Sequence, residues 1–174
     1  RARAHSGPRL MRGFSRGVCA IFGVRIERRG ESPPRGECLV APNHWSYLDV
    51  FVLGSIYPTL YVSRADVAEW PIFGFLARSG GTLFLRRELR KDAARVGGEI
   101  ERHLRLGVTV TVFLEGGAGT GVDVRQFKPA LLESAVATGA RCVPVAIRYR
   151  LPRDPGADPS RVVAWVDGGF VPHL

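Results

Sequence analysis

The sequence CLVAPNHWSYLDVFVLGSI, residues 38–56, joins two apolar stretches through a short polar turn. The first stretch, 38–41, is short and apolar, which is typical of a strand, whereas 48–56 has the length and composition of a helix. The turn between them carries His44, and Asp49 follows five positions later. A strand followed by a helix is the repeating unit of α/β proteins, so this stretch favours a layered α/β domain.

Apolar segments alternate in the same manner along the rest of the chain. Strands are predicted at 60–63, 82–86, 108–114, 142–149 and 162–167, and helices at 70–77, 90–106 and 130–138. The last helix is expected to end at Gly139, because glycine readily closes a helix. The 174 residues fit one domain. We therefore expect a single α/β domain with a mainly parallel mixed sheet flanked by helices.

The N-terminal segment, 1–36, differs from the main domain, 37–174, in its basic and amphipathic character. Residues 9–24 carry apolar side chains at helical spacing with arginines between them. Such a helix can lie in a lipid headgroup layer, or it can pack on its own domain with the arginines in water. The apolar runs are too short to span a bilayer. Because the chain begins with Arg1, we expect it to be truncated at both ends.

The chain is strongly basic, with a formal net charge of +9 and an isoelectric point of about 10.5. A membrane surface, nucleic acid or a phosphorylated substrate would suit this charge, and so would a need for solubility alone. The arginines are scattered rather than interleaved with aromatic residues, which disfavours nucleic acid. The three cysteines, Cys19, Cys38 and Cys142, have no metal-ligand spacing. We expect reduced thiols and no metal site.

His44 and Asp49 would diverge on a straight helix, because residues five apart differ there by about 140°. The two side chains can meet if His44 lies in the turn and Asp49 in the first helical turn, with Ser46 as N-cap. A second interpretation gives them no chemical role. Ser46-x-x-Asp49 also resembles a capping box, in which Asp49 only satisfies a backbone N–H and His44 is an ordinary turn residue.

Four blocks in sequence order resemble the glycerolipid (lysophospholipid) acyltransferase family. They are Asn43-His44-x4-Asp49, Gly81-Thr-Leu-Phe84-Leu-Arg-Arg87, Phe113-Leu-Glu115-Gly116 and Val143-Pro-Val-Ala-Ile147. Shorter intervening stretches, such as Phe127-Lys128-Pro129, are similar as well. The resemblance implies an acyltransferase fold and makes 37–174 the catalytic domain.

The resemblance also implies roles for particular residues. His44 would be the general base and Asp49 the carboxylate that orients it. Arg87 would present a guanidinium to an acidic headgroup. Further substrate-binding residues would be Asn43, Phe84, Glu115, Gly116 and Lys128. The partners would be an acyl thioester donor (acyl-CoA or acyl-ACP), a lysolipid acceptor and an anionic membrane surface. We expect no cofactor or metal, and a site at the cytoplasmic face of the cell membrane, peripheral or anchored by a missing segment.

The third block departs from the pattern of the family, which continues from F-P-E-G into Thr-Arg. Here Leu114 replaces the proline, and Gly117 and Ala118 replace the threonine and arginine. That arginine helps to hold an acceptor phosphate, so its loss questions 1-acyl-sn-glycerol-3-phosphate as the acceptor. A branch of the family that acylates lyso-ornithine lipid also lacks it, and the ending 165–174 resembles that branch. This acceptor is the alternative within the class.

Two other classes of function remain as alternatives. The glycine-rich 117–121 follows a predicted strand, as a dinucleotide-binding loop does, but the strand-like 122–124 follows where a helix should open. The other alternative is a catalytically inactive module that binds anionic membranes. It would bind vesicles and show no turnover that depends on His44.

Overall fold

The computed structural model describes residues 2–31, 36–86, 88–119, 123–151, 154 and 156–159. Its elements in chain order are α1 (Ala2–Ile21), β1 (Cys38–Pro42), α2 (Leu48–Ile56), β2 (Leu60–Arg64), the 3-10 helix η1 (Ala65–Glu69), α3 (Phe73–Ser79), β3 (Leu83–Leu85), α4 (Arg90–Arg105), β4 (Val110–Thr111), the 3-10 helix η2 (Pro129–Leu131), α5 (Glu133–Thr138) and β5 (Arg141–Val145). The strand predicted at 162–167 and the ending 165–174 lie outside the described residues.

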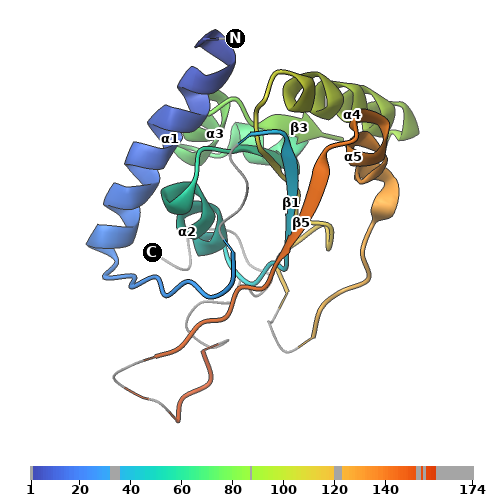
Figure 1. Cartoon of the computed structure of the whole chain (residues 1–174). Helices are drawn as coiled ribbons and strands as arrows, with labels where there is room; N and C mark the ends of the chain where they lie inside the picture. Colours follow the sequence, from blue (N-terminus) through green and yellow to red (C-terminus); the bar gives the residue numbers. More distant parts are fainter. Residues whose placement is uncertain are drawn as a thin grey trace.

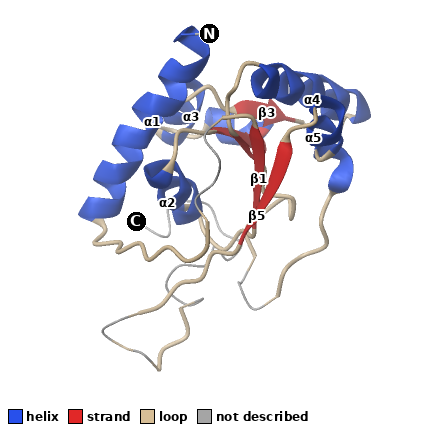
Figure 2. Ribbon diagram, in the orientation of Figure 1, coloured by secondary structure: helices blue, strands red, loops and turns tan. Residues whose placement is uncertain are grey.

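The five strands form one sheet in the order β3-β2-β4-β1-β5, and all four pairings are parallel. Helices cover both faces of the sheet, with α1 and α2 on one side and α4 and α5 on the other (Figures 1 and 2). The prediction of an α/β domain with a parallel sheet flanked by helices is therefore confirmed. Because every strand runs the same way, all their carboxyl ends lie along one edge.

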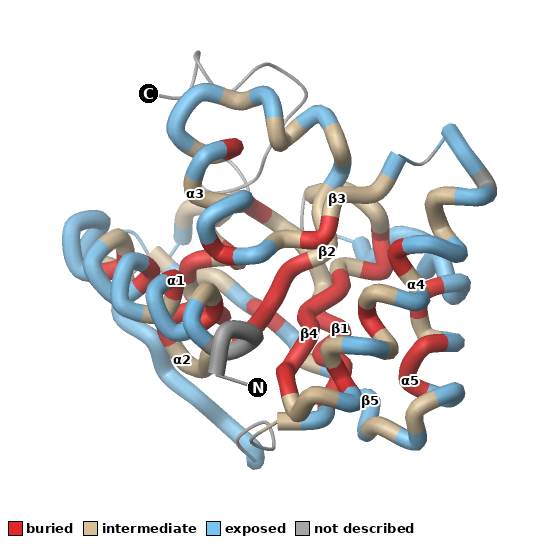
Figure 3. Tube along the Cα trace, turned by 90° about the horizontal axis from the view of Figure 1, so that it is seen from above, coloured by how far each residue is buried: buried red, intermediate tan, exposed pale blue. Residues whose placement is uncertain are grey.

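The main hydrophobic core lies between the sheet and helices α4 and α5. Alternate strand residues such as Leu39, Val110 and Leu83 point to this face and pack against Val96 and Ile100 of α4. The alternation follows from the two-residue period of a strand. Figure 3 shows the buried trace of the central strands and the more exposed outer turns of the surrounding helices.

Helix α1 begins seven residues earlier than predicted. The helix includes Pro8 and starts at Ala2 rather than at residue 9. Its first turns lie against the turn that follows α3, since a Cβ at Gly7 would be only 3.0 Å from the carbonyl oxygen of Gly80. The backbones can approach this closely because Gly7 has no side chain.

Helix α1 also packs against α2, with the Phe14 and Phe51 rings 6.0 Å apart between centroids. Its Arg16 donates to the carbonyl oxygen of Ser55 on α2 at 3.3 Å. A further set of apolar side chains on or just after the helix is exposed: Leu10, Phe14, Ile21 and Phe22. Packing on its own domain and an exposed apolar surface therefore coexist on this helix.

The strand predicted at 108–114 is shorter than its apolar run. Regular ladder pairing covers only Val110–Thr111, although Val108, Val112 and Leu114 are also buried. A turn in which Gly116 N–H donates to the carbonyl of Phe113 takes the chain out of the sheet. The apolar run therefore predicted burial correctly, but the predicted strand is longer than the observed one.

Two predicted helices begin with a different structure. Pro71 and the left-handed Ile72, with φ of 63°, precede α3, so the helix expected at 70–77 starts at Phe73. The helix expected at 130–138 opens as the 3-10 helix η2 and continues as α5. Gly139 closes α5 with φ of 68°, as predicted.

The strand predicted at 142–149 forms its ladder over Arg141–Val145. Strand β1 ends opposite Val145 at Pro42, so regular pairing has no partner beyond this point. The chain continues along the same edge and reaches Tyr149 beside the turn that follows β1.

Candidate active site

The residues from the first, third and fourth sequence blocks come together at the carboxyl edge of the sheet. The turn after β1 supplies 43–49, the chain after β4 supplies 113–116, and the chain after β5 supplies 147–149. Strand β1 lies between β4 and β5, so the three segments are neighbours. Open α/β sheets commonly bind ligands at this edge.

His44 and Asp49 form a close pair at the centre of this group. The distance from His44 Nδ1 to Asp49 Oδ2 is 2.8 Å. The Asp49 side chain is fully buried, whereas that of His44 keeps 16% of its surface exposed. His44 lies in the turn and Asp49 in the first turn of α2, which is the geometry that the spacing required.

Backbone N–H groups hold the Asp49 carboxylate in place. Its Oδ2 accepts from the N–H of Trp45 at 2.7 Å and from that of Ser46 at 2.9 Å. The bond to Ser46 is the one that a capping box predicts, so Asp49 both caps the helix and contacts His44. The two interpretations of the motif are compatible.

Helix α2 begins at Leu48, after Tyr47, whose backbone is already helical and whose side chain makes no cap bond. Ser46 supplies the side-chain contact of a cap, because its Oγ accepts from the N–H of Leu48 at 3.2 Å. Ser46 is fully buried. A buried hydroxyl that already accepts a backbone hydrogen bond is poorly placed to act as a nucleophile.

The protonation pattern of His44 follows from its partner. An ionised carboxylate only accepts hydrogen bonds, so Nδ1 carries the proton that bridges to Asp49. The opposite nitrogen, Nε2, makes no hydrogen bond to any residue within the described ranges. The imidazole stacks on the Phe113 ring with centroids 3.9 Å apart and planes 21° apart. His44 is therefore oriented by Asp49 and Phe113, and its Nε2 can accept a proton.

Tyr149 is the member of this group that the sequence analysis missed. Its hydroxyl donates to Asp49 Oδ1 at 2.5 Å. Burial and the negative charge of Asp49 raise the pKa of Tyr149 well above its ordinary value, so the hydroxyl remains a donor. The two residues are 100 positions apart, and a tyrosine after a predicted strand carries no pattern that would identify it.

Glu115 contacts the backbone of the turn that carries His44 rather than a neighbouring side chain. Its Oε1 accepts from the N–H of His44 at 2.8 Å, and its Oε2 accepts from the N–H of Arg125 at 2.9 Å. The carbonyl of His44 accepts from the N–H of Gly119 at 2.8 Å. Glu115 and Gly119 thus hold the main chain of His44 on both sides. Glu115 is 5% exposed, and its predicted contact with substrate stays a prediction.

Gly116 and Lys128 are close together next to Glu115. Gly116 has φ of 75°, a backbone conformation that strongly favours glycine. A Cβ at Gly116 would be 3.3 Å from Lys128 Nζ, so the lysine side chain crosses over the glycine. Lys128 is exposed. It lines an open hollow of about 610 Å³ together with Arg125 and Glu133.

Asn43 connects β1 to the segment after β5. Its side-chain nitrogen donates to the carbonyl of Ile147 at 3.1 Å, and its side-chain oxygen accepts from the N–H of Ile147 at 2.6 Å. The amide thereby fixes the segment that carries Tyr149. Its predicted contact with substrate is not tested by this geometry.

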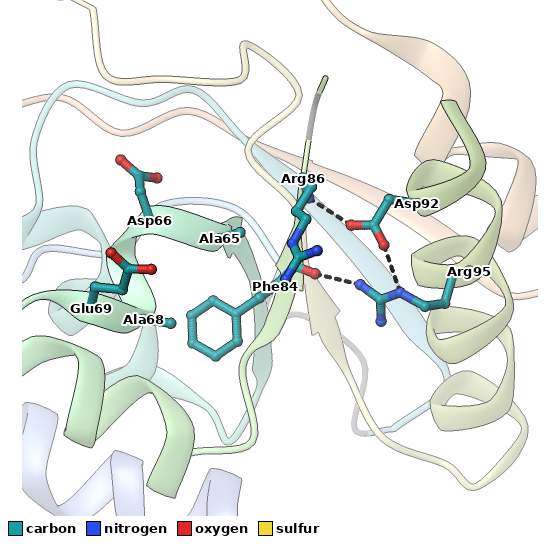
Figure 4. Close-up of a pocket in the computed structure, with 8 residues that line it drawn as sticks. All are labelled: Ala65, Asp66, Ala68, Glu69, Phe84, Arg86, Asp92 and Arg95. Atoms are coloured by element: carbon teal, nitrogen blue, oxygen red, sulfur yellow. Dashed lines mark hydrogen bonds and ion pairs between the residues drawn. The ribbon is translucent and has the colours of Figure 1, made fainter. Parts of the chain in front are cut away.

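The second sequence block is on β3, and two strands, β2 and β4, lie between it and β1. Arg87 lies outside the described residues. Phe84 is half-buried on β3 and lines a hollow of about 580 Å³ between η1 and the start of α4 (Figure 4). The predicted substrate residue Phe84 is therefore beside a cavity, although it does not contact His44 in the way that Phe113 does.

The described part of the chain contains no group of three or more His, Cys, Asp or Glu side chains that could hold a metal ion. Within the same ranges, no helix combines the length and the apolar character that a membrane crossing requires. Cys19 and Cys38 are buried and Cys142 is exposed, and none of the three forms a disulfide.

A family model described as Acyltransferase matches residues 23–148. A 1-acyl-sn-glycerol-3-phosphate acyltransferase of Neisseria meningitidis is 34% identical, over 78% of this chain and 54% of that protein. A lyso-ornithine lipid O-acyltransferase of Rhizobium meliloti is also 34% identical, over 95% of this chain and 60% of that protein. The chain thus spans little more than half the length of these relatives.

A crystal structure of a 1-acyl-sn-glycerophosphate acyltransferase from Thermotoga maritima has a similar fold. The TM-score is 0.63 at 22% sequence identity, and the match covers 78% of this chain and 55% of the other. At this identity the likeness concerns the fold alone.

Proposed function

Because the chain belongs to the acyltransferase family, we propose that it transfers a fatty acyl group from an acyl thioester to the free hydroxyl of a lysolipid. The observation that carries the proposal is the pair formed by His44 and the fully buried Asp49, 2.8 Å apart at the carboxyl edge of the sheet. The thioester donor is acyl-CoA or acyl-ACP, and the reaction uses neither a cofactor nor a metal.

His44 acts as the general base in the proposed mechanism. Its Nε2 takes the proton of the acceptor hydroxyl while the oxygen attacks the thioester carbonyl, and the new C–O bond forms. Collapse of the tetrahedral intermediate breaks the C–S bond, and the leaving thiolate receives the proton from His44. Asp49 stabilises the imidazolium that forms between these steps. The thioester is already activated, so no acyl-enzyme is required.

The surroundings of the pair support a base rather than an ordinary turn histidine. Four donors converge on the Asp49 carboxylate, from His44, Trp45, Ser46 and Tyr149. A capping carboxylate would need only the backbone donors. The additional bonds fix the orientation of one imidazole, which is the function of the third member in a catalytic triad.

The first acceptor candidate is 1-acyl-sn-glycerol-3-phosphate, the substrate in the name of the Neisseria relative. The second is lyso-ornithine lipid, which is in the name of the Rhizobium relative. A specific observation favours the second: Ala118 occupies the position where the family places an arginine for phosphate. Arg125, Lys128 and Arg64 are the cations that could replace it.

We also propose that the protein acts at the cytoplasmic face of the cell membrane, where its lysolipid acceptor is part of the bilayer. The net charge of +9 suits an anionic lipid surface. The exposed apolar side chains Leu10, Ile21 and Phe22 supply the apolar contact that peripheral binding needs.

The test is a transfer assay with the natural polypeptide at its full length in mixed micelles. A labelled acyl thioester is offered with each of the two lysolipids in turn, and the lipid products are separated by chromatography. We expect a labelled diacyl product with at least one acceptor. Release of free fatty acid without an acylated lipid would make the protein a thioesterase, and binding to micelles without any product would favour the inactive membrane module.

A further inference from the structure

Three aromatic rings lie one behind another between helix α2 and the turn that carries His44. The imidazole of His44 and the Phe113 ring are 3.9 Å apart between centroids, with 21° between their planes. The Phe113 and Tyr61 rings are 6.4 Å apart between centroids, with 9° between their planes. Both pairs are nearly parallel rather than edge-to-face. We call these three rings the aromatic column.

The sheet sets the order of the rings in the column. Tyr61 belongs to β2 and is the register partner of Thr111 on β4. Phe113 follows Thr111 by two residues, so its side chain lies on the same face of the sheet as that of Tyr61. His44 follows β1, which is the neighbour of β4 on its other side. The column therefore crosses three neighbouring strands on the face that α2 covers.

Helix α2 fixes the far end of the column. Tyr61 is 7% exposed, and its hydroxyl donates to the carbonyl of Val50 at 2.7 Å. A Cβ at Gly54 would be 3.3 Å from the same hydroxyl, so the backbone of α2 lies against it. The residue before Val50 is Asp49, which holds Nδ1 of His44. The start of α2 thus holds the imidazole by two routes, one through a carboxylate and one through the column.

The hydrogen bond to Asp49 does not fix the plane of the imidazole by itself. It holds one ring atom, Nδ1, and the last side-chain torsion of a histidine has a broad energy profile that opposes tilting only weakly. A flat ring stacked on the imidazole does oppose tilting, because a tilted ring loses contact on one side and clashes on the other. The direction of Nε2 therefore depends on the hydrogen bond and on the stack together.

We propose that Phe113 is a positioning residue for acyl transfer, which holds the plane of the His44 imidazole because the Tyr61 ring supports it from behind. This inference rests on the proposed function, in which Nε2 takes the proton of the acceptor hydroxyl. A general base must reach that proton within hydrogen-bond distance, so its orientation affects the rate. Position 113 then requires a flat ring, and an apolar side chain of another shape does not suffice.

The first experiment measures kcat and KM for the preferred lysolipid with variants of the full-length polypeptide in mixed micelles. Phe113→Leu keeps an apolar side chain and removes the flat ring, whereas Phe113→Tyr keeps the ring. Tyr61→Leu removes the supporting ring without changing any atom that contacts His44. The melting temperature of each variant is measured by circular dichroism.

Phe51→Leu is the matched control for the loss of an aromatic side chain. Phe51 is buried on α2, and its ring lies 6.0 Å from that of Phe14 and 6.2 Å from that of Phe73 between centroids. These rings belong to α1 and α3 and are not members of the column. The control therefore loses packing next to α2 while the stack on His44 remains.

The second experiment detects the stack itself by NMR, in protein labelled at histidine and without any substrate. A proton that lies over the face of an aromatic ring resonates upfield of its usual position. The ring protons of His44 therefore report its contact with Phe113. His44→Ala identifies these resonances among those of the four histidines of the chain.

We expect Phe113→Leu to lower kcat about tenfold with little change in KM, because a small error in the position of a catalytic group slows the reaction. Tyr61→Leu should cause a smaller fall of the same kind. Both variants should move the His44 ring-proton resonances downfield. Phe113→Tyr should keep most of the activity, and Phe51→Leu should lower the melting temperature but leave kcat and the His44 resonances unchanged.

Wild-type kcat in Phe113→Leu, or an equal fall of kcat in Phe51→Leu, would overturn the inference. The NMR measurement separates it from the proposed reaction. If no lysolipid is acylated while Phe113→Leu and Tyr61→Leu still move the His44 resonances, the reaction fails and the orientation of His44 by the column stands. If transfer depends on His44 while Phe113→Leu changes neither kcat nor these resonances, the column fails and the reaction stands.

Discussion

At the scale of single residues, the Asp49 carboxylate organises the site. It is fully buried and accepts four hydrogen bonds, from two side chains and two backbone N–H groups. A buried charge is tolerated only where its lone pairs are satisfied. Each of these bonds therefore helps to satisfy the buried carboxylate and to hold His44 in one orientation.

Tyr149→Phe tests whether the bond on Oδ1 affects the chemistry. The substitution removes a donor to a buried carboxylate, a contact of about 1.5–3 kcal/mol, so we expect kcat to fall about tenfold. The Michaelis constant for the lysolipid should change little, because Tyr149 contacts Asp49 and supports the base. The measurement is kcat and KM of both proteins with the preferred lysolipid.

Tyr61→Phe is the control for this prediction. Tyr61 is also a buried tyrosine with a raised pKa, but its hydroxyl donates to the carbonyl of Val50 at 2.7 Å instead of to Asp49. It should change stability without lowering kcat. Equal kcat values for Tyr149→Phe and the wild type would show that Tyr149 is only a structural partner.

The sequence predicts the contact between His44 and Asp49 but not the residues that hold the two in place. The spacing of His44 and Asp49 indicates a contact because both residues belong to one turn and one helix start. Tyr149 and Glu115 reach the same turn through the order of strands in the sheet, which a single sequence does not reveal. Glu115 was predicted at the site, whereas its bond to the backbone of His44 depends on the turn at Gly116.

At the scale of elements, α4 is tied to the end of β3 through Asp92. Its Oδ2 accepts from the N–H of Arg86 at 2.6 Å, and its Oδ1 accepts from Arg95 at 2.7 Å. The bond with Arg95 is the main cause that lowers the pKa of Asp92 to about 2. A carboxyl with a lowered pKa stabilises the folded state at neutral pH, and that contribution disappears as the pH falls.

Asp92→Asn should therefore lower the melting temperature at pH 7, where the wild-type carboxylate is ionised. The difference should shrink as the pH falls from about 4, near the pKa of an unfolded aspartate, toward 2. Thermal unfolding followed by circular dichroism between pH 7 and pH 3 measures both proteins, with Glu101→Gln as the control. A difference in melting temperature that stays constant over this pH range would contradict the stabilising role of the ionised Asp92.

Element boundaries were predicted best where local chemistry sets them. Leu48–Ile56 was predicted to the residue, because the polar turn before it and Pro58 after it limit the helix. The strand at 108–114 was overestimated because an apolar run reports burial rather than ladder pairing. The short helix η1, which supplies one wall of the hollow, has no apolar periodicity and was not predicted.

At the scale of the whole molecule, several of the exposed apolar side chains belong to two helices, α1 and α3. On α1 and just after it these are Leu10, Phe14, Ile21 and Phe22, and on or next to α3 they are Ile72 and Phe75. The backbone of α1 at Gly7 approaches Gly80, the residue that follows α3. We expect these two helices to face the membrane.

Ile21→Asp tests this orientation. Ile21 is 83% exposed, and losing its burial in lipid costs about 1.5–3 kcal/mol, so the partition coefficient on anionic vesicles should fall about tenfold. Val136→Asp is the matched control, because Val136 is also 83% exposed but lies on α5, across the sheet from α1. Vesicle binding is measured by co-sedimentation. Equal losses of binding for the two variants would show that the membrane does not bind at α1.

The central claim is that His44 is the base for acyl transfer, and His44→Ala tests it most directly. His103→Ala is the control, since His103 lies on α4 and contacts the carbonyl of Glu99 at 2.8 Å. The measurement is kcat for transfer of a labelled acyl group to the preferred lysolipid, with folding checked by circular dichroism. We predict a fall of about a hundredfold or more for His44→Ala and none for His103→Ala. A folded His44→Ala protein that retains wild-type kcat would contradict the account.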